Sequence, residues 1–299
     1  MRNLDERTSN WRQLKRLRGL RGLRVGRILA LAMLALGCSR EKVERIEWPV
    51  MGTVAAVQTR GATPEETAGV VRLVKTEFAR VEKLLNAHDP NSELNRLAPL
   101  PDAEVLAHCD ESVRSCYEMA FDLMRKSGGA FNPRWRGTNT LDLGAIAKGF
   151  AVDCAALAVG AVDGADRLLD LGGNLFAVRG LWKTGIAGTE IVIPLSEGCA
   201  CATSAEYYRG RHISDGRTGL AVSNGVASVT VQVCGSAMEA DGLSTTLFVL
   251  GPMEGKKFLV EKWKTVGVQA VWFMQDGSMV EHHSRAFVLP SRGCQSAGM

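Results

Sequence analysis

The fold of this chain is decided by the stretch Leu141-Asp-Leu-Gly-Ala-Ile-Ala-Lys-Gly-Phe-Ala-Val-Asp-Cys-Ala-Ala-Leu-Ala-Val-Gly-Ala-Val162. Its first ten residues are built around glycine and alanine and indicate a strand–turn–helix transition. Residues 148–162 are small and apolar, which is typical of a buried helix that packs closely on a sheet. The stretch therefore predicts a fold in which helices cover a sheet.

Four more helices are predicted, at residues 63–86, 110–126, 236–250 and 253–262. The first begins with Thr63-Pro-Glu-Glu66, a capping box with proline at the first helical position. Gly128-Gly129 ends the second helix, and Gly251-Pro252 separates the last two. Each boundary is thus supported by a residue type that favours a helix end.

Strands are predicted at residues 45–59, 167–171, 174–179, 183–187, 190–195 and 226–234, with a late hairpin that turns at Asp276-Gly277. The helices and strands do not alternate as a regular βαβ repeat, and no linker rich in proline or serine divides residues 45–291. We therefore expect one α+β domain of mixed or antiparallel sheets with packed helices over residues 45–291.

The composition is that of an ordinary globular protein, with 299 residues, 46% hydrophobic and 23% charged. It excludes a disordered or fibrous chain, and the absence of an apolar run of about 18 to 20 residues excludes a polytopic membrane protein. The net charge of +4 is uneven, because residues 1–27 hold nine basic and two acidic side chains, which leaves −3 for the rest. A nucleic-acid partner is therefore not expected.

An uncharged segment at residues 28–37 follows the basic residues and precedes Cys38. A basic region, a short apolar region and a small residue before the cleavage point form a secretory signal, and Cys38 resembles the cysteine of a bacterial lipobox. A buried amphipathic helix and a nucleic-acid-binding arm are the alternatives. We expect a lipoprotein signal peptide at residues 1–37, a tether at residues 38–44 and a tail at residues 292–299. Lipid on Cys38 would hold the chain at the bacterial cell membrane, facing the periplasm or the exterior.

Seven cysteines remain after Cys38, namely Cys109, Cys116, Cys154, Cys199, Cys201, Cys234 and Cys294. An odd number without repeating spacing argues against a disulfide framework, although it leaves individual pairs open. Cys199-Ala-Cys201 has no second pair of Cys or His at the spacing of a zinc site. We expect most of these residues to be buried thiols.

One pair of oxygen-bearing side chains suits a hard cation. Asp241 and Thr245 are four residues apart on a predicted helix, so a carboxylate and a hydroxyl project from the same face. Mg²⁺ prefers oxygen donors and uses one or two carboxylates together with substrate phosphates. The alternative is that Asp241 caps or pairs on a solvated helix face while Thr245 bonds the carbonyl four residues before it.

Three polar segments could serve a ligand. Lys148 lies among small residues that allow close approach to a phosphate, although tight helix-to-sheet packing explains the same residues. His212 precedes Asp215 and Arg217 in a polar loop, so it could act as a general base or as a phosphate partner, or form a surface hydrogen bond. The turn at residues 87–96 is explained by loop chemistry alone.

These segments, in this order, resemble the ApbE family of FAD:protein FMN transferases over about residues 50–255. The matching blocks are Met51-Gly-Thr53, Asp89-Pro-Asn-Ser-Glu-Leu94, Gly129-Ala-Phe-Asn132, Leu141–Gly149, Leu171-Gly-Gly-Asn174, Ala202-Thr-Ser204, His212-Ile213, Arg217-Thr-Gly219 and Met238–Thr245. Each block is short, and their collinear order carries the resemblance. It favours the functional interpretations of Lys148, Asp241 and Thr245 over the alternatives.

The resemblance implies a periplasmic or surface lipoprotein that uses FAD and Mg²⁺. Such an enzyme transfers FMN from FAD to a Thr or Ser hydroxyl of an exported acceptor flavoprotein and releases AMP. It implies Asp241, Thr245 and the backbone oxygen of Ala145 as metal ligands, and His212 as catalytic base. It implies a FAD site made by Met51, His88, Ala130, Phe131, Asn132, Asp142, Lys148 and Ile213.

The chain also departs from the family pattern. Only Arg134–Thr140 separate Pro133 from the Leu141 block, where the family usually has a sizeable stretch, so a loop or hairpin beside the flavin is shortened. Two alternative functions remain: a FAD pyrophosphatase that releases FMN and AMP with water as acceptor, and a flavin-binding lipoprotein without turnover.

Overall fold

The computed structural model describes residues 42–162, 164–186, 189–206, 212–263 and 267–284. The predicted signal peptide, Cys38, the start of the tether and the predicted tail lie outside the described residues, and the predicted domain limits stay a prediction. Within the described part, no helix is long and apolar enough to cross a membrane.

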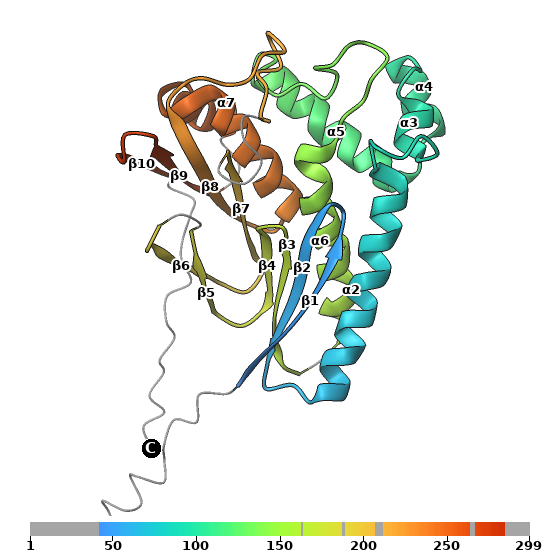
Figure 1. The fold of residues 1–299 in the computed structure, drawn as a ribbon, viewed down its shortest axis with the longest axis vertical. Coiled ribbons are helices and arrows are strands. Elements are labelled where there is room, and N and C mark those ends of the chain that lie inside the picture. The colour runs from blue at the N-terminus through green and yellow to red at the C-terminus, as the bar shows by residue number, and fades with distance from the viewer. Residues whose placement is uncertain (1–41, 163, 187–188, 207–211, 264–266, 285–299) are drawn as a thin grey trace, which may run out of the picture. The chain divides into compact units, whose positions relative to one another are not determined.

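The centre of the fold is an antiparallel sheet of eight strands (Figure 1). In spatial order the strands are β1 (Val43–Val50), β2 (Thr53–Arg60), β3 (Asp166–Leu171), β4 (Asn174–Arg179), β7 (Cys199–Ala205), β8 (Val226–Cys234), β9 (Val268–Met274) and β10 (Met279–His283). Every neighbouring pair is antiparallel. The expected α+β class is confirmed.

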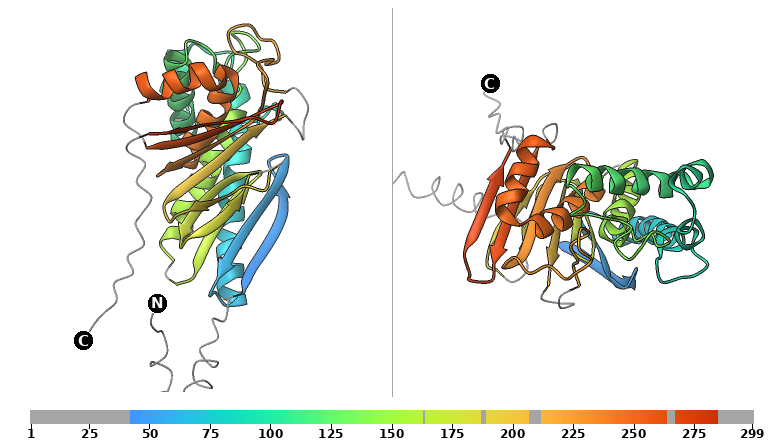
Figure 2. Two further views of the ribbon diagram at one scale, coloured as in Figure 1. Left: turned by 90° about the vertical axis from the view of Figure 1, so that its left-hand side faces the viewer. Right: turned by 90° about the horizontal axis from the view of Figure 1, so that it is seen from above.

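Helices cover one face of this sheet. The helices are α2 (Pro64–Leu85), α3 (Glu93–Leu97), α4 (Asp102–His108), α5 (Glu111–Lys126), α6 (Gly144–Gly160) and α7 (Ala237–Glu261). Because α6 contacts β3 and β4, α7 contacts β7 and β8, and the two helices contact each other, they lie side by side on the same face (Figures 1 and 2). The large core lies between these helices and the sheet.

The opposite face carries a smaller core under a two-stranded sheet of β5 (Trp182–Gly185) and β6 (Val192–Leu195). This second core consists of Leu168, Ala177, Trp182, Leu195, Cys199 and Cys201. Adjacent residues of β3 divide between the two cores, since Leu168 packs in the small one and Leu169 in the large one. The alternation of side chains along a strand explains the division.

Several predicted boundaries are confirmed. Thr63 forms the capping box of α2, and Asp110 caps α5. Gly251 has a φ of 68° and interrupts α7, so two helical segments meet there as expected. The predicted late hairpin forms from β9 and β10.

Other expectations need correction. The segment 45–59 is two strands joined at Met51-Gly52, and α6 begins at Gly144 instead of residue 148. The sequence did not predict α3 and α4, because helices of five and seven residues are too short to express a period. It also missed β7, whose Cys-Ala-Cys-Ala-Thr-Ser-Ala sequence has one strongly β-favouring residue, Thr203. This segment is a strand because β4 and β8 flank it.

One disulfide is present, a pairing that the sequence had left open. Cys199 and Cys234 occupy facing positions in β7 and β8, and their sulfurs are bonded at 2.09 Å. The separation of 35 residues in sequence does not reveal that strand pairing places them together. Cys116 and Cys201 are buried free thiols as expected, and burial raises the pKa of Cys201 to about 12.

Candidate functional site

The crossing of α6 and α7 depends on a glycine. A Cβ on Gly149 would lie 2.3 Å from the carbonyl oxygen of Ala237, which no real side chain tolerates. Glycine therefore allows the backbones of the two helices to touch. This close approach brings the first turns of α6 beside Asp241, which follows Ala237 by one turn of α7.

Asp241 is a buried carboxylate at this crossing, with 5% of its surface exposed. Its Oδ2 accepts a hydrogen bond from the backbone N–H of Gly149 at 3.0 Å and lies 3.7 Å from the Nζ of Lys148. Burial raises the pKa of Asp241, and the charge of Lys148 opposes that shift. The alternative of a solvated helix face is therefore wrong for Asp241.

The first turn of α6 has a carbonyl available for a ligand. In a regular α-helix the N–H of Gly149 would donate to the oxygen of Ala145, four residues before it. Here that N–H donates to the Asp241 carboxylate at 3.0 Å. A carbonyl oxygen has two lone pairs, so the Ala145 oxygen can accept from a further partner, as the metal role that the resemblance implies for it requires.

The hydroxyl of Thr245 faces the sheet. Its Oγ1 lies 3.1 Å from the Oγ of Ser204 in β7, and that Ser204 oxygen lies 2.8 Å from the Oγ of Ser244. The predicted bond to the carbonyl four residues before is made instead by Thr246, which donates to Gly242. Three hydroxyls thus gather on the sheet side of α7, near the helix turn that carries Asp241.

The donor set suits a hard cation. Near Asp241, the side-chain oxygen of Asn174 is buried and accepts no hydrogen bond from the described residues. Among those residues no group of three His, Cys, Asp or Glu side chains could hold a metal. One carboxylate, hydroxyls, a carbonyl and an orphaned amide oxygen fit Mg²⁺, which takes few carboxylates and completes its shell with phosphates.

Asp153 anchors the start of α7, and sequence analysis missed it. Its carboxylate accepts hydrogen bonds from the Ser236 hydroxyl at 2.7 Å and from the N–H groups of Ala237 and Met238 at 2.6 and 3.0 Å. Burial raises the pKa of Asp153, and these hydrogen bonds oppose the shift. The available signal was a lone acid within an otherwise apolar helix.

A second group of predicted site residues meets at the loop after β7. Gly216 donates its N–H to the Ala130 oxygen at 3.0 Å, and the Asn132 amide donates to the Gly216 oxygen at 3.2 Å. A Cβ on Gly216 would lie 2.4 Å from the Cβ of Asn132. The loop that contains His212 and Ile213 is therefore fastened to the segment Ala130–Asn132, far away in sequence.

Asp142 joins this second group. Its N–H donates to the Pro133 oxygen at 2.8 Å, and its Oδ1 accepts the N–H of Gly144 at 2.9 Å at the start of α6. The indole N–H of Trp135 lies 3.4 Å from its Oδ2. Asp142 therefore connects the loop group to the helix that carries Ala145 and Lys148.

The two histidines of the predicted site, His88 and His212, are both exposed. His212 is exposed in the loop after β7, beside the buried Ile213. His88 is exposed in a turn that Asn95 holds by three hydrogen bonds, and no hydrogen bond of its side chain joins it to the other candidates among the described residues. The predicted loop is present before Ser92, but Glu93–Leu97 form α3, so the interpretation of residues 87–96 as a loop is wrong for its second half.

Met51 lies in the turn between β1 and β2, where its φ is 51°. Its N–H donates to Glu82 Oε1 at 3.0 Å. Glu82 lies in the last turn of α2, and the turn that contains His88 follows this helix. The neighbouring Thr53 side chain fills the space where a Cβ on Gly172 would lie. Met51 therefore sits close both to the end of α2 and to the β3–β4 turn that precedes Asn174.

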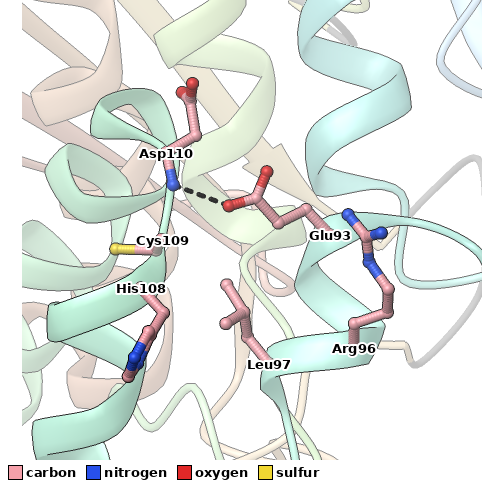
Figure 3. Close-up of a pocket in the computed structure, with 6 residues that line it drawn as sticks. All are labelled: Glu93, Arg96, Leu97, His108, Cys109 and Asp110. Atoms are coloured by element: carbon pink, nitrogen blue, oxygen red, sulfur yellow. Dashed lines mark hydrogen bonds between the residues drawn. The ribbon is translucent and has the colours of Figure 1, made fainter.

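A pocket of about 510 Å³ lies elsewhere, between α3 and the start of α5 (Figure 3). Its lining is Glu93, Arg96, Leu97, His108, Cys109 and Asp110. The Glu93 carboxylate accepts the N–H of Asp110 at 2.6 Å across it, and Figure 3 shows this bond between the helices. The pocket contains none of the predicted site residues, so we do not assign it to the site.

Comparison with known sequences gives a consistent result. Residues 134–272 match the model of the ApbE family. A FAD:protein FMN transferase of Haemophilus influenzae is 31% identical over 168 residues, which cover 49% of this chain and 47% of that protein. One of Treponema pallidum is 28% identical over 309 aligned positions, which cover 76% and 83%. The chain thus aligns with about half the length of the first relative and most of the second.

Solved structures agree on the fold. The apo flavinyl transferase ApbE of Pseudomonas stutzeri superimposes with a TM-score of 0.65 at 23% identity, covering 84% of this chain and 97% of that one. The flavin transferase ApbE of Vibrio cholerae gives 0.68 at 21% identity, covering 83% and 98%. At these identities the similarity concerns the fold.

Proposed function

The chain belongs to the ApbE family, and from this premise we propose that it is a Mg²⁺-dependent FAD:protein FMN transferase. It transfers FMN from FAD to a Thr or Ser hydroxyl of an exported acceptor flavoprotein and releases AMP. The observation that carries the proposal is the buried carboxylate of Asp241, held at the crossing of α6 and α7 beside Lys148, one helical turn before Thr245.

Asp241, Thr245 and the Ala145 oxygen would hold the metal. When bound, Mg²⁺ supplies charge neutralisation on the pyrophosphate of FAD. Lys148 supports this role in two ways. Its Nζ favours the ionised form of Asp241, and a single ammonium in this position can also meet a phosphate oxygen.

The remaining roles follow from chemistry at the acceptor. The imidazole of His212 takes the proton of the attacking Thr or Ser hydroxyl while the new phosphoester bond forms. The bond from the FMN phosphorus to the bridging oxygen of the pyrophosphate breaks, and AMP leaves with that oxygen. Met51, His88, Ala130, Phe131, Asn132, Asp142 and Ile213 would line the FAD site, supported by the loop packing through Gly216.

The test uses the mature chain with FAD, Mg²⁺ and an acceptor domain that carries a Thr motif. We expect flavin fluorescence on the acceptor in a denaturing gel, and equimolar AMP. Asp241→Asn and an acceptor with Thr→Val are the matched controls and should give no labelled band. Absence of label with the wild-type chain, under conditions where another family member labels the same acceptor, would refute the proposal.

A FAD pyrophosphatase activity is the second candidate. His212 is exposed, so water can reach the proposed base when no acceptor is bound. Release of free FMN and AMP in the absence of acceptor measures this activity. If acceptor addition leaves the rate and the products unchanged, hydrolysis is the function instead of transfer.

We also propose the predicted location, a lipid anchor on Cys38 that holds the chain at the outer side of the bacterial cell membrane. The lipobox-like sequence before Cys38 supports it. In cells, Cys38→Ser should move the protein out of the membrane fraction and abolish labelling by a fatty-acid analogue. Retention of the label in that variant would contradict the anchor.

A further inference from the structure

The short segment between Pro133 and Leu141 is held rigidly in place. Its anchor is Arg134, whose guanidinium donates to the carbonyls of Ala98, Thr138 and Thr140 at 2.8, 2.7 and 3.2 Å. The side chain of Arg134 is 14% exposed and also pairs with Asp102 at 3.1 Å. The two residues that follow Arg134 are therefore presented from a fixed backbone.

Trp135 and Arg136 form a stacked pair on this segment. The guanidinium carbon of Arg136 lies 4.6 Å from the centre of the Trp135 ring. The Trp135 indole N–H points to Asp142, and its carbonyl oxygen lies 3.8 Å from where a Cβ on Gly219 would be. The pair thus lies between the start of α6 and the His212 loop, both of which belong to the proposed FAD site.

The guanidinium of Arg136 has N–H groups that donate to no described residue. Within the described part of the chain, its only charged partner is Asp142, with a loose separation of 3.8 Å, and its side chain is 51% exposed. Stacking uses the face of a guanidinium and leaves the N–H groups along its edge open. Planar, paired donors of this kind match the oxygens of a phosphate.

A second Arg–Trp pair in the chain shows what a structural pair looks like. Arg60 lies 5.0 Å over the ring of Trp182, but its guanidinium also donates to Asp166 and to the Leu181 carbonyl. Trp182 is buried at 5% exposure, and its N–H donates to Arg179 at 2.9 Å. The Arg60 guanidinium thus donates to two partners, whereas the Arg136 guanidinium makes no hydrogen bond to a described residue.

We infer that Arg136 binds a phosphate of the FAD pyrophosphate. Trp135 is the positioning residue that orients the Arg136 guanidinium for this contact. The inference rests on the proposed function, because FAD is the ligand. It assigns a phosphate contact to the segment that is shorter here than is usual in the family.

The experiment measures equilibrium binding of FAD, ADP and riboflavin to the mature chain by calorimetry, without acceptor. Arg136→Gln should weaken FAD and ADP by roughly five- to tenfold, and the loss should shrink at high salt, because the contact is ionic. Riboflavin, which has no phosphate, should bind with unchanged affinity. Arg125→Gln, an equal loss of charge on an exposed residue of α5, should bind all three ligands normally.

Trp135 variants test the positioning role. Trp135→Leu should weaken FAD by roughly the same factor as Arg136→Gln, and Trp135→Phe, which keeps a ring for stacking, should recover most of the affinity. The double variant Trp135→Leu/Arg136→Gln should be no worse than Arg136→Gln alone, because both changes remove one contact. Circular dichroism checks that each variant is folded.

The outcomes separate this inference from the proposed function. Wild-type binding of FAD with unchanged affinity in Arg136→Gln overturns the inference alone. An equal loss for riboflavin overturns the phosphate contact, and additive losses in the double variant overturn the positioning role. A wild-type chain that binds neither FAD nor ADP overturns the proposed function together with the inference.

Discussion

Two regions of this molecule carry the predicted site residues, and they are built differently. At the crossing of α6 and α7, Asp241 is buried and Gly149 lets two backbones touch. In the loop after β7, His212 and Arg217 are exposed, and hydrogen bonds of Gly216 join this loop to the segment Ala130–Asn132. The first region is part of the core, so changes in its packing act on stability and activity together, whereas changes in the second region can alter activity with little effect on stability.

The largest effect is expected from Gly149→Ala at the crossing. The new Cβ meets the backbone of Ala237 at 2.3 Å, so the helices must separate. We expect a loss of roughly 1–3 kcal/mol in the free energy of unfolding and nearly complete loss of transfer. Denaturant unfolding and the gel assay measure both.

The matched control for that change is Gly160→Ala at the end of the same helix, where a Cβ meets nothing within 4 Å. It should be neutral or gain up to about 1 kcal/mol, because alanine favours a helix over glycine. If both alanine variants behave alike, the close approach of α6 and α7 is not what places Asp241.

Asp241→Asn should separate stability from activity within the crossing. Transfer should fall by about 100-fold or more, because the asparagine removes the charge that holds the metal. The fold should lose little stability or gain some, because burial raises the pKa of Asp241 and its ionised form is disfavoured in the folded state.

The pH dependence of stability tests whether the ionised Asp241 destabilises the folded state. With a raised pKa, the folded chain binds a proton at Asp241 before the unfolded chain does, so this carboxylate destabilises the fold above its folded pKa. As the pH falls through that pKa toward the ordinary value of 3.8, the penalty disappears. Any stability advantage of Asp241→Asn over wild type should therefore be largest near pH 7 and shrink in acid, as followed by denaturant unfolding at several pH values. An advantage that grows in acid would contradict this account.

In the loop after β7, Gly216→Ala should affect activity more than stability. Its Cβ would lie 2.6 Å from the carbonyl oxygen of Gly129, so the His212 loop must move away from Ala130–Asn132. We expect a roughly tenfold loss of transfer with less than about 1 kcal/mol of destabilisation, because the loop is largely exposed. Gly185→Ala, where a Cβ has open space, is the control. Unchanged transfer in Gly216→Ala would remove the loop from the site.

The smallest effect is expected from Glu254→Gln. Its carboxylate lies 3.7 Å from Arg217, but the two side chains are 63% and 40% exposed. Exposed ion pairs contribute about 0–1 kcal/mol, so the melting temperature and the transfer rate should stay within error of the wild type. A large loss of transfer would instead mean that this pair orients the loop.

Local features of the fold were predictable from sequence, because they depend on neighbours along the chain. The capping box at Thr63, the stop after Lys126, the interruption at Gly251 and the late hairpin were all predicted and are present. Each is set by a hydrogen bond or a backbone preference within a few residues. By contrast, β7 and the Cys199–Cys234 disulfide depend on strand pairing and were not predicted.

The site divides in the same way. The sequence by itself determined that Asp241 and Thr245 share a helix, that Lys148 belongs to another helix, and that the basic charge is concentrated before residue 28. Only the tertiary structure decided that Asp241 is buried, that it accepts a hydrogen bond from Gly149 at a separation of 92 residues, and that Asp153 anchors its helix. Burial and pKa are properties of packing between distant segments, whereas helix faces and charge follow from the order of residues.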